Sequence, residues 1–389
     1  MKKIILYFIL STLPFSIFAQ SERKVFKIGI FAPLYLDSVF NGTLYKFGKK
    51  FPRFAVQGMS FVQGIQIAID SFPIDGANIE TFIFDSQSDS LSIKNIINSH
   101  RIDNFNLVIG AVKDNEFAEL ASFANRKKIP FISATYPNDG GVTSNPYLIM
   151  LNPTLKSHCQ TIFGYLLQHQ DSAKIIHVRQ TGSQEDRVAE YINNINKPDD
   201  KVLLNIKTII LDSNFASIKN SLDSNKKNII IGGSLDEDFA NPLLSTIKNI
   251  DKKYKVTIFG MPNWEGFSSL ETKLKDLPKN ITYLYTSPYF NEKSDSTSKK
   301  IQDIYLKKFK GRPSEYLYKG FEIMYVFSRI LNNYPDDFLN HINDAQFQMF
   351  TSYKIIPVKV NKNSKSTDYL ENKHLYFLKK TNSIISQAQ

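Results

Sequence analysis

Side chains that commonly perform catalysis are present in this sequence, but they do not occur at catalytic spacings. None of the six histidines follows another at a metal-binding spacing such as His-x-x-x-His. There is no Gly-x-Ser-x-Gly nucleophile motif and no phosphate-binding loop that ends in Gly-Lys-Ser or Gly-Lys-Thr. His158 and Cys159 are adjacent, so their side chains diverge on a helix and make a poor catalytic pair. We therefore predict that the chain is not an enzyme and carries no metal or cofactor.

Residues suited to binding follow several short apolar runs. Tyr35, Tyr136 and Trp264 stand just after such runs, and Trp264 is the only tryptophan. Aromatic rings in a polar cleft stack on sugars, nucleobases or other rings. Ordinary packing within a loop explains each ring at least as well. Gly232-Gly233-Ser234 is a second candidate, for phosphate, although two glycines are a weak signal.

The elements that would position these residues come in two series of strands and helices. In the first series, strands are expected at 24–31, 79–84, 107–110, 130–133 and 147–151, and helices at 57–71, 92–98 and 116–126. In the second, strands are expected at 174–178, 205–211, 228–232, 256–260 and 282–285, and helices at 185–194, 215–222 and 238–249. Strands that alternate with helices indicate βαβ units and parallel sheets. The sequence therefore predicts an α/β protein with two doubly wound parallel-sheet lobes.

The last hundred residues have a different pattern. Residues 299–309 and 315–331 have the strongest helical periodicity in the chain. Residues 353–360 and 374–378 are expected to form two strands joined by a polar turn, as in a hairpin. Residues 41–52 and 361–372 are polar, and we expect both to be surface loops.

The first residues have the layout of a secretory signal peptide. Lys2 and Lys3 precede an apolar run from Ile4 to Phe15, and the small residue Ala19 stands at the expected cleavage position. The run is short for a membrane span, which needs about 20 residues, so a retained anchor is the less favoured alternative. No cysteine follows the run to carry a lipid anchor. We predict export, with a signal peptide at 1–19 and no stable membrane insertion after its cleavage.

Composition limits the function further. The apolar fraction of 42% and the aromatic fraction of 13% are ample for packed cores. The formal charge is +11, but the lysines are scattered, so we interpret them as a solvated surface and expect no nucleic-acid partner. Cys159 is the only cysteine, so it has no intrachain disulfide partner, and we expect a buried thiol.

In open parallel sheets, ligands bind beyond the carboxyl ends of the strands, where helix N-termini offer unpaired N–H groups. Applied to the predicted strands, this rule selects six loops: 33–37, 112–115, 134–137, 180–183, 234–238 and 262–266. They supply our candidate ligand-binding residues: Tyr35, Lys113, Asn115, Ala134, Thr135, Tyr136, Thr181, Asp236 and Trp264.

Short motifs in the order of the chain resemble one family. They are 27–33 (Lys-Ile-Gly-Ile-Phe-Ala-Pro), 64–70, Phe84-Asp85 with Asp89, 108–111, 129–135, 309–313 and 318–322. Together they resemble the type I periplasmic binding proteins, of the leucine/isoleucine/valine-binding branch that serves ABC transporters. The similarity extends over nearly all of the chain after the signal peptide.

The resemblance implies two lobes joined by three crossover segments, with a ligand trapped between the lobes by hinge closure. It places the crossovers near Leu151, Ser287 and Phe347. One lobe would then hold 20–151 and 288–346, and the other 152–287 and 347–389. Relatives hold a ligand carboxylate with a serine at a helix start, where this chain has Asp114 and Asn115, with Lys113 before them. The family's second contact corresponds to Ala134 and Thr135, and its ammonium partner to Asp236 or Glu237.

The resulting hypothesis is a periplasmic solute-binding protein that closes on a small polar ligand, amino-acid-like or other, for an ABC-type permease of the inner membrane. The alternative is a ligand sensor or an interaction protein for envelope assembly, with the same fold and a degenerate cleft.

Overall fold

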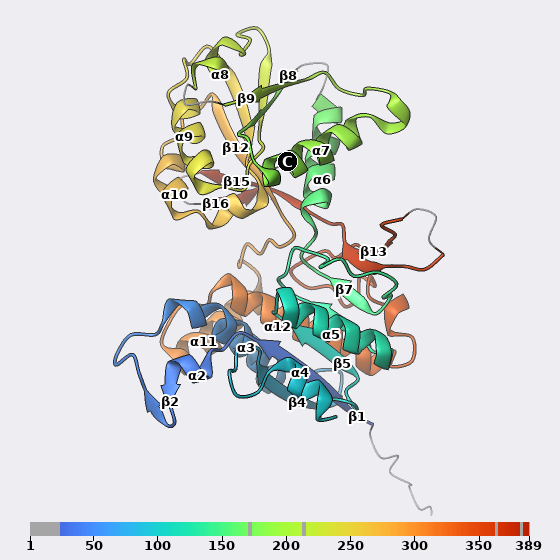
Figure 1. The fold of residues 1–389 in the computed structure, drawn as a ribbon. Coiled ribbons are helices and arrows are strands. Elements are labelled where there is room, and N and C mark those ends of the chain that lie inside the picture. Colours follow the sequence, from blue (N-terminus) through green and yellow to red (C-terminus); the bar gives the residue numbers. More distant parts are fainter. Residues whose placement is uncertain (1–23, 170–172, 212–214, 362–364, 382–383, 389) are drawn as a thin grey trace, which may run out of the picture.

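The computed structural model describes residues 24–169, 173–211, 215–361, 365–381 and 384–388. The predicted signal peptide, 1–19, lies outside these residues. The described chain forms two α/β lobes, each built on a seven-stranded sheet, with the chain passing between them (Figure 1). The predicted fold class, two doubly wound lobes joined by crossover segments, is confirmed.

The first sheet has the strand order β13-β14-β7-β6-β5-β1-β4. Its strands are β1 (Val25–Ala32), β4 (Asn78–Asp85), β5 (Leu107–Gly110), β6 (Phe131–Ser133), β7 (Leu148–Met150), β13 (Ile355–Val358) and β14 (Tyr369–Asn372). All neighbours pair in parallel except β13 with β14. The central strands are almost wholly apolar because helices cover both faces of the sheet.

The second sheet repeats this plan, with the order β16-β15-β12-β11-β10-β8-β9. Its strands are β8 (Ala173–Arg179), β9 (Ile206–Ile210), β10 (Lys227–Gly232), β11 (Lys255–Phe259), β12 (Ile281–Ser287), β15 (Tyr376–Thr381) and β16 (Ile384–Gln387). In both sheets the first strand of the series lies between the second and the third, so each sheet has a topological switch point at that strand.

Helices of the first lobe are α2 (Leu36–Val39), α3 (Arg53–Ser71), α4 (Ile93–Asn98), α5 (Asp114–Lys127), α11 (Ser296–Phe309) and α12 (Glu315–Asn333). Those of the second lobe are α6 (Leu155–His169), α7 (Ser183–Asn196), α8 (Ala216–Asn220), α9 (Glu237–Lys248) and α10 (Ser268–Leu274). Short 3₁₀ helices are η2 (Pro198–Asp200), η3 (Pro262–Gly266) and η4 (Phe338–Asn340). A small hairpin, β2 (Phe40–Asn41) and β3 (Leu44–Tyr45), follows α2, where the sequence predicted a loop.

The chain passes from the first sheet to the second after Met150, and returns to the first lobe after Ser287. The third crossing was predicted near Phe347, and this is wrong. Both β13 and β14 pair within the first sheet, so the chain crosses only after Asn372, on its way to β15.

Two further predictions about this region are wrong for the same reason. Residues 353–360 and 374–378 do not form a hairpin, because β13 pairs with β14 and β15 pairs with β12. The predicted loop 361–372 ends in β14, whose four residues are all buried. The strand was not predicted because it ends in two polar residues, Glu371 and Asn372. Both side chains form hydrogen bonds, Glu371 with Thr154 N–H and Asn372 with the carbonyl oxygen of Leu151.

Candidate functional site

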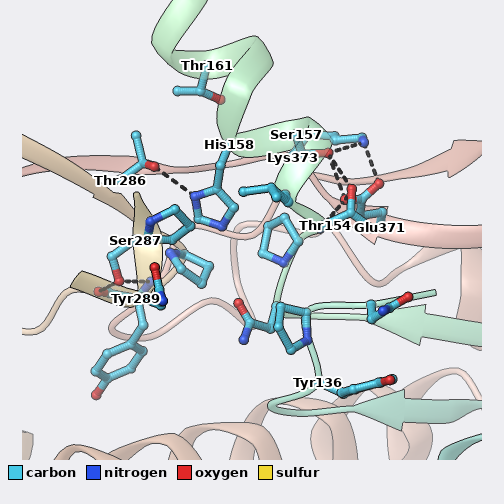
Figure 2. A pocket seen from close by; sticks show the side chains of 18 of the residues that line it. Tyr136, Thr154, Ser157, His158, Thr161, Thr286, Ser287, Tyr289, Glu371 and Lys373 are labelled. Atoms are coloured by element: carbon cyan, nitrogen blue, oxygen red, sulfur yellow. Dashed lines mark hydrogen bonds and ion pairs between the residues drawn. The ribbon is translucent and has the colours of Figure 1, made fainter. Parts of the chain in front are cut away.

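A large cavity of about 1780 Å³ lies between the two lobes. Its walls come from the loop after β6, the start of α6, helix α7, the η3 segment, the end of β12, the start of α12, and strands β13 and β14. Part of this wall is drawn in Figure 2. Because both lobes and the crossing segments contribute, a bound molecule would contact both lobes at once.

One side of the cavity is built around the buried carboxylate of Glu371, at the end of β14. It accepts hydrogen bonds from the backbone N–H of Thr154 at 2.8 Å, from Thr154 Oγ1 at 3.0 Å and from Ser157 Oγ at 2.7 Å. Lys373 Nζ forms an ion pair with it and also donates to Ser157 Oγ at 2.6 Å (Figure 2). The carboxylate thus holds the start of α6, in the second lobe, against a strand of the first.

His158 also lines the cavity, one turn into α6. Its Nδ1 lies 2.7 Å from Thr286 Oγ1, near the end of strand β12, just before the chain crosses to the first lobe (Figure 2). Burial lowers the pKa of His158 to about 3, because the protonated ring would lose its hydration. The imidazole is therefore neutral near pH 7 and serves as a hydrogen-bonding group rather than a charge.

The cavity also carries a carboxylate and an ammonium group on opposite lobes. Glu265 lies in η3 of the second lobe, and Tyr285 Oη donates to its Oε1 at 3.4 Å. Lys319 lies on α12 of the first lobe, with its Nζ 5.2 Å from the centre of the Tyr289 ring and 5.6 Å from that of Tyr316. Each of these rings offers its face to the cation.

Both charged groups are surrounded by enough protein to shift their pKa values. Desolvation raises the pKa of Glu265, and the attraction of Lys319 partly opposes that rise. Desolvation lowers the pKa of Lys319, opposed by the charges of Glu265, Glu315 and Glu322. A bound group of opposite charge would stabilise Glu265 or Lys319 more than it would stabilise a fully hydrated charge, because both side chains have already lost part of their hydration.

Of the nine candidate ligand-binding residues, only Tyr136 lines the cavity. Its hydroxyl donates to Asp114 Oδ1 at 3.0 Å, so the ring bridges two of the selected loops. Lys113 and Asn115 are exposed at the start of α5, and Lys113 pairs with Asp114 at 3.9 Å. Ala134 is buried, and Thr135 accepts a hydrogen bond from Asn152 through its carbonyl oxygen.

Trp264 belongs to the core of the second lobe, where only 1% of it is exposed. Its Nε1 donates to the carbonyl oxygen of Ser234 at 2.8 Å, and its ring packs against Gly232 and Gly260. The expectation that this ring stands in the cleft is wrong. Gly232 and Gly260 have no side chains, so the ring can pack against their backbone in the core of the second lobe. Its neighbour Glu265 faces the cavity instead.

Tyr35 lies outside the cavity because an internal carboxylate already occupies its loop. Asp85, at the end of β4, accepts hydrogen bonds from the backbone N–H groups of Leu34, Tyr35 and Leu36 at 2.9, 3.1 and 2.7 Å. The strand-end rule found a real anion-binding position. The anion bound there is the chain's own aspartate.

In the second lobe, too, hydrogen bonds from the lobe's own side chains occupy the strand-end loops. Ser234 Oγ donates to Glu185 Oε1 at 2.5 Å, at the start of α7. Asp236 caps α9 by accepting from Asp238 N at 3.0 Å, and it accepts from Gln180 Nε2 at 3.2 Å. Thr181 is exposed and, like Asp236, does not line the cavity.

The charged residues that line the cavity were not among the sequence candidates, although sequence reasoning came close to two of them. Glu265 lies in the selected loop 262–266, and Lys319 lies within the motif 318–322. Glu371 and Lys373 carry no signal in the sequence, because they lie at or just after the end of what reads as a polar loop, 361–372.

Within the described residues, no group of three or more His, Cys, Asp or Glu side chains is placed to hold a metal ion. No described helix combines the length and apolar character that crossing a membrane requires. Cys159 is buried in the second lobe with a free thiol, as predicted.

Comparison with known families gives one match, to the family model described as periplasmic binding protein, over residues 53–346. No curated protein matches the sequence.

Solved structures of low sequence identity share the fold. One is a putative branched-chain amino acid ABC transporter from Rhodospirillum rubrum, with a TM-score of 0.64, 11% identity, and coverage of 94% of this chain and 100% of that one. A periplasmic ligand-binding protein of a branched-chain amino acid ABC transporter from Burkholderia xenovorans has a TM-score of 0.62 and 12% identity, with 94% of each chain covered. An ABC transporter substrate-binding protein from Desulfitobacterium hafniense, in complex with Leu, has a TM-score of 0.57 and 11% identity, with 94% and 100% covered.

Proposed function

The chain belongs to the periplasmic binding protein family, and from this premise we propose that it binds a small zwitterionic solute between its lobes for an ABC-type permease. The observation that carries the proposal is the placement of a carboxylate, Glu265, and an ammonium group, Lys319, in the wall of one cavity on opposite lobes. The role is one of binding and delivery, with no chemical step.

Charge decides the class of ligand. An ammonium group would be held by the carboxylate of Glu265, and a carboxylate group by the ammonium of Lys319. A ligand that carries only one of these charges would leave the other protein group desolvated and unpaired, which is costly. An amino acid or a similar zwitterion satisfies both. The known ligand of the Desulfitobacterium hafniense relative, Leu, belongs to this class.

Ring faces next to Lys319 support the same class. Tyr289 and Tyr316 both lie within 6 Å of the cation, measured from Nζ to the ring centre. Together they form an apolar wall beside the carboxylate position, where the side chain of an amino acid could pack. The aromatic contacts also hold Lys319 in place before the ligand arrives, which lowers the entropy lost on binding.

Closure would bring the two charged groups to one ligand. We propose that residues 24–151 with 288–372 move as one body against residues 152–287 with 373–388. The network around Glu371 lies at the segments that connect them, so it serves as the hinge anchor. A ligand that contacts both lobes favours the closed state by its additional contacts there.

The periplasm is the compartment we propose, on the strength of the family and of the predicted signal peptide at 1–19. The permease of the inner membrane is the proposed partner that receives the ligand.

A thermal-shift panel tests the ligand class. The full set of L-amino acids would be compared with decarboxylated amines, N-acetylated amino acids, sugars and nucleosides. We expect a rise in melting temperature with one or more free amino acids and a much smaller one with either blocked form. A shift produced only by sugars or nucleosides, or by none of the compounds, contradicts the proposal.

Two variants test the residues. We expect Glu265→Gln and Lys319→Met each to weaken binding about 10- to 100-fold, since each removes a charged hydrogen-bonding partner. Glu271→Gln and Lys300→Met remove the same charges outside the cavity and should leave affinity unchanged. Full affinity in both cavity variants would show that the ligand binds elsewhere.

A further inference from the structure

An exposed patch of aromatic and aliphatic side chains covers α2, the β2–β3 hairpin and the start of α3. Its apolar members are all exposed: Leu36, Phe40, Leu44, Phe47, Phe51, Phe54 and Val56. Leu44, at the hairpin end, is 70% exposed. Seven such residues within 21 positions (36–56) are far more than the single exposed apolar residues that are normal on a protein surface.

These side chains are held in place by local structure. The hairpin pairs Phe40 with Tyr45 and Asn41 with Leu44, around a turn in which Gly42 has a φ of 58°. Tyr45 Oη donates to the carbonyl oxygen of Lys50 at 2.5 Å, which ties the following loop to the hairpin. The hairpin stands out from the first lobe in Figure 1.

Neighbouring rings of the patch contact one another in a continuous row. Ring centres are 5.6 Å apart for Phe40 and Tyr45, and 6.1 Å for Tyr45 and Phe47. They are 6.0 Å apart for Phe47 and Phe54, and 5.1 Å for Phe54 and Tyr35. Because these rings are already ordered, less side-chain entropy would be lost when a partner binds to them.

Four cations stand among the apolar residues of this patch: Lys46, Lys49, Lys50 and Arg53. Within the described chain, none of them forms an ion pair with a carboxylate. Lys46 Nζ donates only to the backbone carbonyl of Asp37, at 2.9 Å.

The acidic side chains near the patch are Asp37, Asp85, which accepts from Leu36 N, and Asp89. The carboxylate of Asp37 accepts hydrogen bonds from Ser88 Oγ and Asp89 N, both at 2.9 Å. Asp37 is the only acid between residues 36 and 56, which leaves this segment with a formal charge of +3.

We propose that this aromatic–basic patch docks the protein on an anionic phospholipid surface. Aromatic side chains flanked by lysine and arginine are suited to the membrane interface, where rings enter the headgroup layer and cations meet phosphate. No residue of 36–56 lines the cavity between the lobes, so the patch is separate from the candidate ligand site.

The position of the patch gives the docking a consequence for the ligand. The patch ends in the first turn of α3, and Gln57 on the next turn lines the cavity between the lobes. A protein held at the membrane by this patch therefore carries the first-lobe rim of its cavity close to the lipid surface.

Vesicle co-sedimentation tests the docking. The protein would be purified after expression of the full sequence, and its N-terminus determined by mass spectrometry so that all variants are compared in the same form. We expect binding to vesicles of phosphatidylglycerol and phosphatidylcholine at low salt, at least about tenfold weaker binding to phosphatidylcholine alone, and weakening as salt rises.

Two double variants separate the apolar and the basic contributions. Leu44→Ser with Phe51→Ser, and Lys49→Glu with Lys50→Glu, should each weaken binding to the anionic vesicles by about tenfold or more. The matched controls, Val202→Ser with Leu306→Ser and Lys252→Glu with Lys253→Glu, change exposed residues elsewhere and should bind as wild type. Melting curves check that each variant is folded.

Two results would overturn the proposal. One is wild-type protein that does not bind the anionic vesicles at low salt. The other is binding that both patch variants retain in full, which would assign it to another part of the chain. Because the patch is separate from Glu265 and Lys319, neither result bears on the ligand.

Discussion

The backbone of Leu317 lies so close to Gly64 that a Cβ on this glycine would come within 1.9 Å of the Leu317 carbonyl oxygen. The contact is reciprocal, since a Cβ on Gly320 would come within 2.1 Å of the carbonyl oxygen of Phe61. Helices α3 and α12 therefore pack backbone to backbone, at a distance that only glycine permits. This packing fixes the helix that carries Lys319.

We expect Gly64→Ala and Gly320→Ala to destabilise the protein by about 2–3 kcal/mol or more, because the two helices must separate to admit the methyl group. Gly164→Ala is the matched control. Gly164 also lies in a helix, α6, but an added Cβ meets no atom within 4 Å. That change should be neutral or stabilise by up to about 1 kcal/mol. Equal effects at all three positions, measured by urea unfolding, would contradict the close packing.

Replacing the hinge-side carboxylate should be costly. Glu371→Ala removes the acceptor shared by Thr154, Ser157 and Lys373, and we expect a loss of about 3–5 kcal/mol in the free energy of unfolding. Glu80→Ala breaks an exposed ion pair with Lys27, at 3.8 Å, on the same sheet. It should cost less than about 1 kcal/mol. Chemical denaturation of both variants compares them directly, and a similar cost for the two would rule out a buried anchor.

Glu322 predicts a dependence of stability on pH. Its carboxylate is buried on α12 and accepts from Phe350 N at 2.8 Å and from Thr351 N at 2.6 Å. Burial raises its pKa to about 7, against an ordinary value of 4.5, and the hydrogen bonds from Thr351 oppose the rise. Between these two pH values the folded state binds more protons than the unfolded state. Its contribution to the free energy of unfolding therefore falls as pH rises from about 4.5 to about 7.

The measurement is the difference between wild type and Glu322→Gln, because other groups titrate in the same range. The buried His158 and His177, for example, have pKa values lowered to about 3 and about 4, and their contribution rises with pH. We expect the wild-type stability, relative to the variant, to fall by up to about 3 kcal/mol between pH 4.5 and 7. A difference that is flat across this range would mean that Glu322 titrates normally.

Trp264 should report on the second-lobe core rather than on the ligand. Its indole is buried and bonded to the carbonyl of Ser234, so we expect blue-shifted emission and little quenching by iodide. Ligands that raise the melting temperature should change this emission little. Trp264→Ala should cost about 3–5 kcal/mol, which thermal or urea unfolding followed by circular dichroism would measure. Strong iodide quenching in the native protein would place the ring at the surface.

Much of the fold could be predicted because apolar periodicity and strand alternation are local. The helix predicted at 315–331 is observed at Glu315–Asn333, and the strand predicted at 107–110 is β5 itself. The strand β14 could not be predicted, because Glu371 and Asn372 are polar residues whose burial depends on partners more than 200 positions away. The common strand order of the two sheets is likewise invisible in the sequence, where no internal repeat is present.

The candidate site was harder to predict than the fold. The strand-end rule selected six loops for a ligand, and in two of them internal carboxylates, Asp85 and Glu185, accept the hydrogen bonds instead. Whether a loop carboxylate satisfies its own lobe or faces the cleft depends on side-chain direction, which neighbouring residues do not reveal. Trp264 and Glu265 are adjacent, yet one is in the core and the other in the cavity wall.

The distance between the lobes, with and without ligand, tests the central claim most directly. Spin labels attached at Thr272→Cys in α10 and Lys299→Cys in α11 would allow this distance to be measured by pulsed electron paramagnetic resonance. Both positions are exposed, and the two helices belong to opposite lobes (Figure 1). Cys159 should stay unlabelled, because it is buried and its thiol pKa is raised to about 12. We predict a shorter distance when a mixture of the twenty L-amino acids is added at a concentration that just saturates the unmodified pair, and a much smaller change at that concentration in the same pair carrying Glu265→Gln. An unchanged distance with the mixture, or equal shortening in the Glu265→Gln form, would contradict closure on a zwitterion held by this residue.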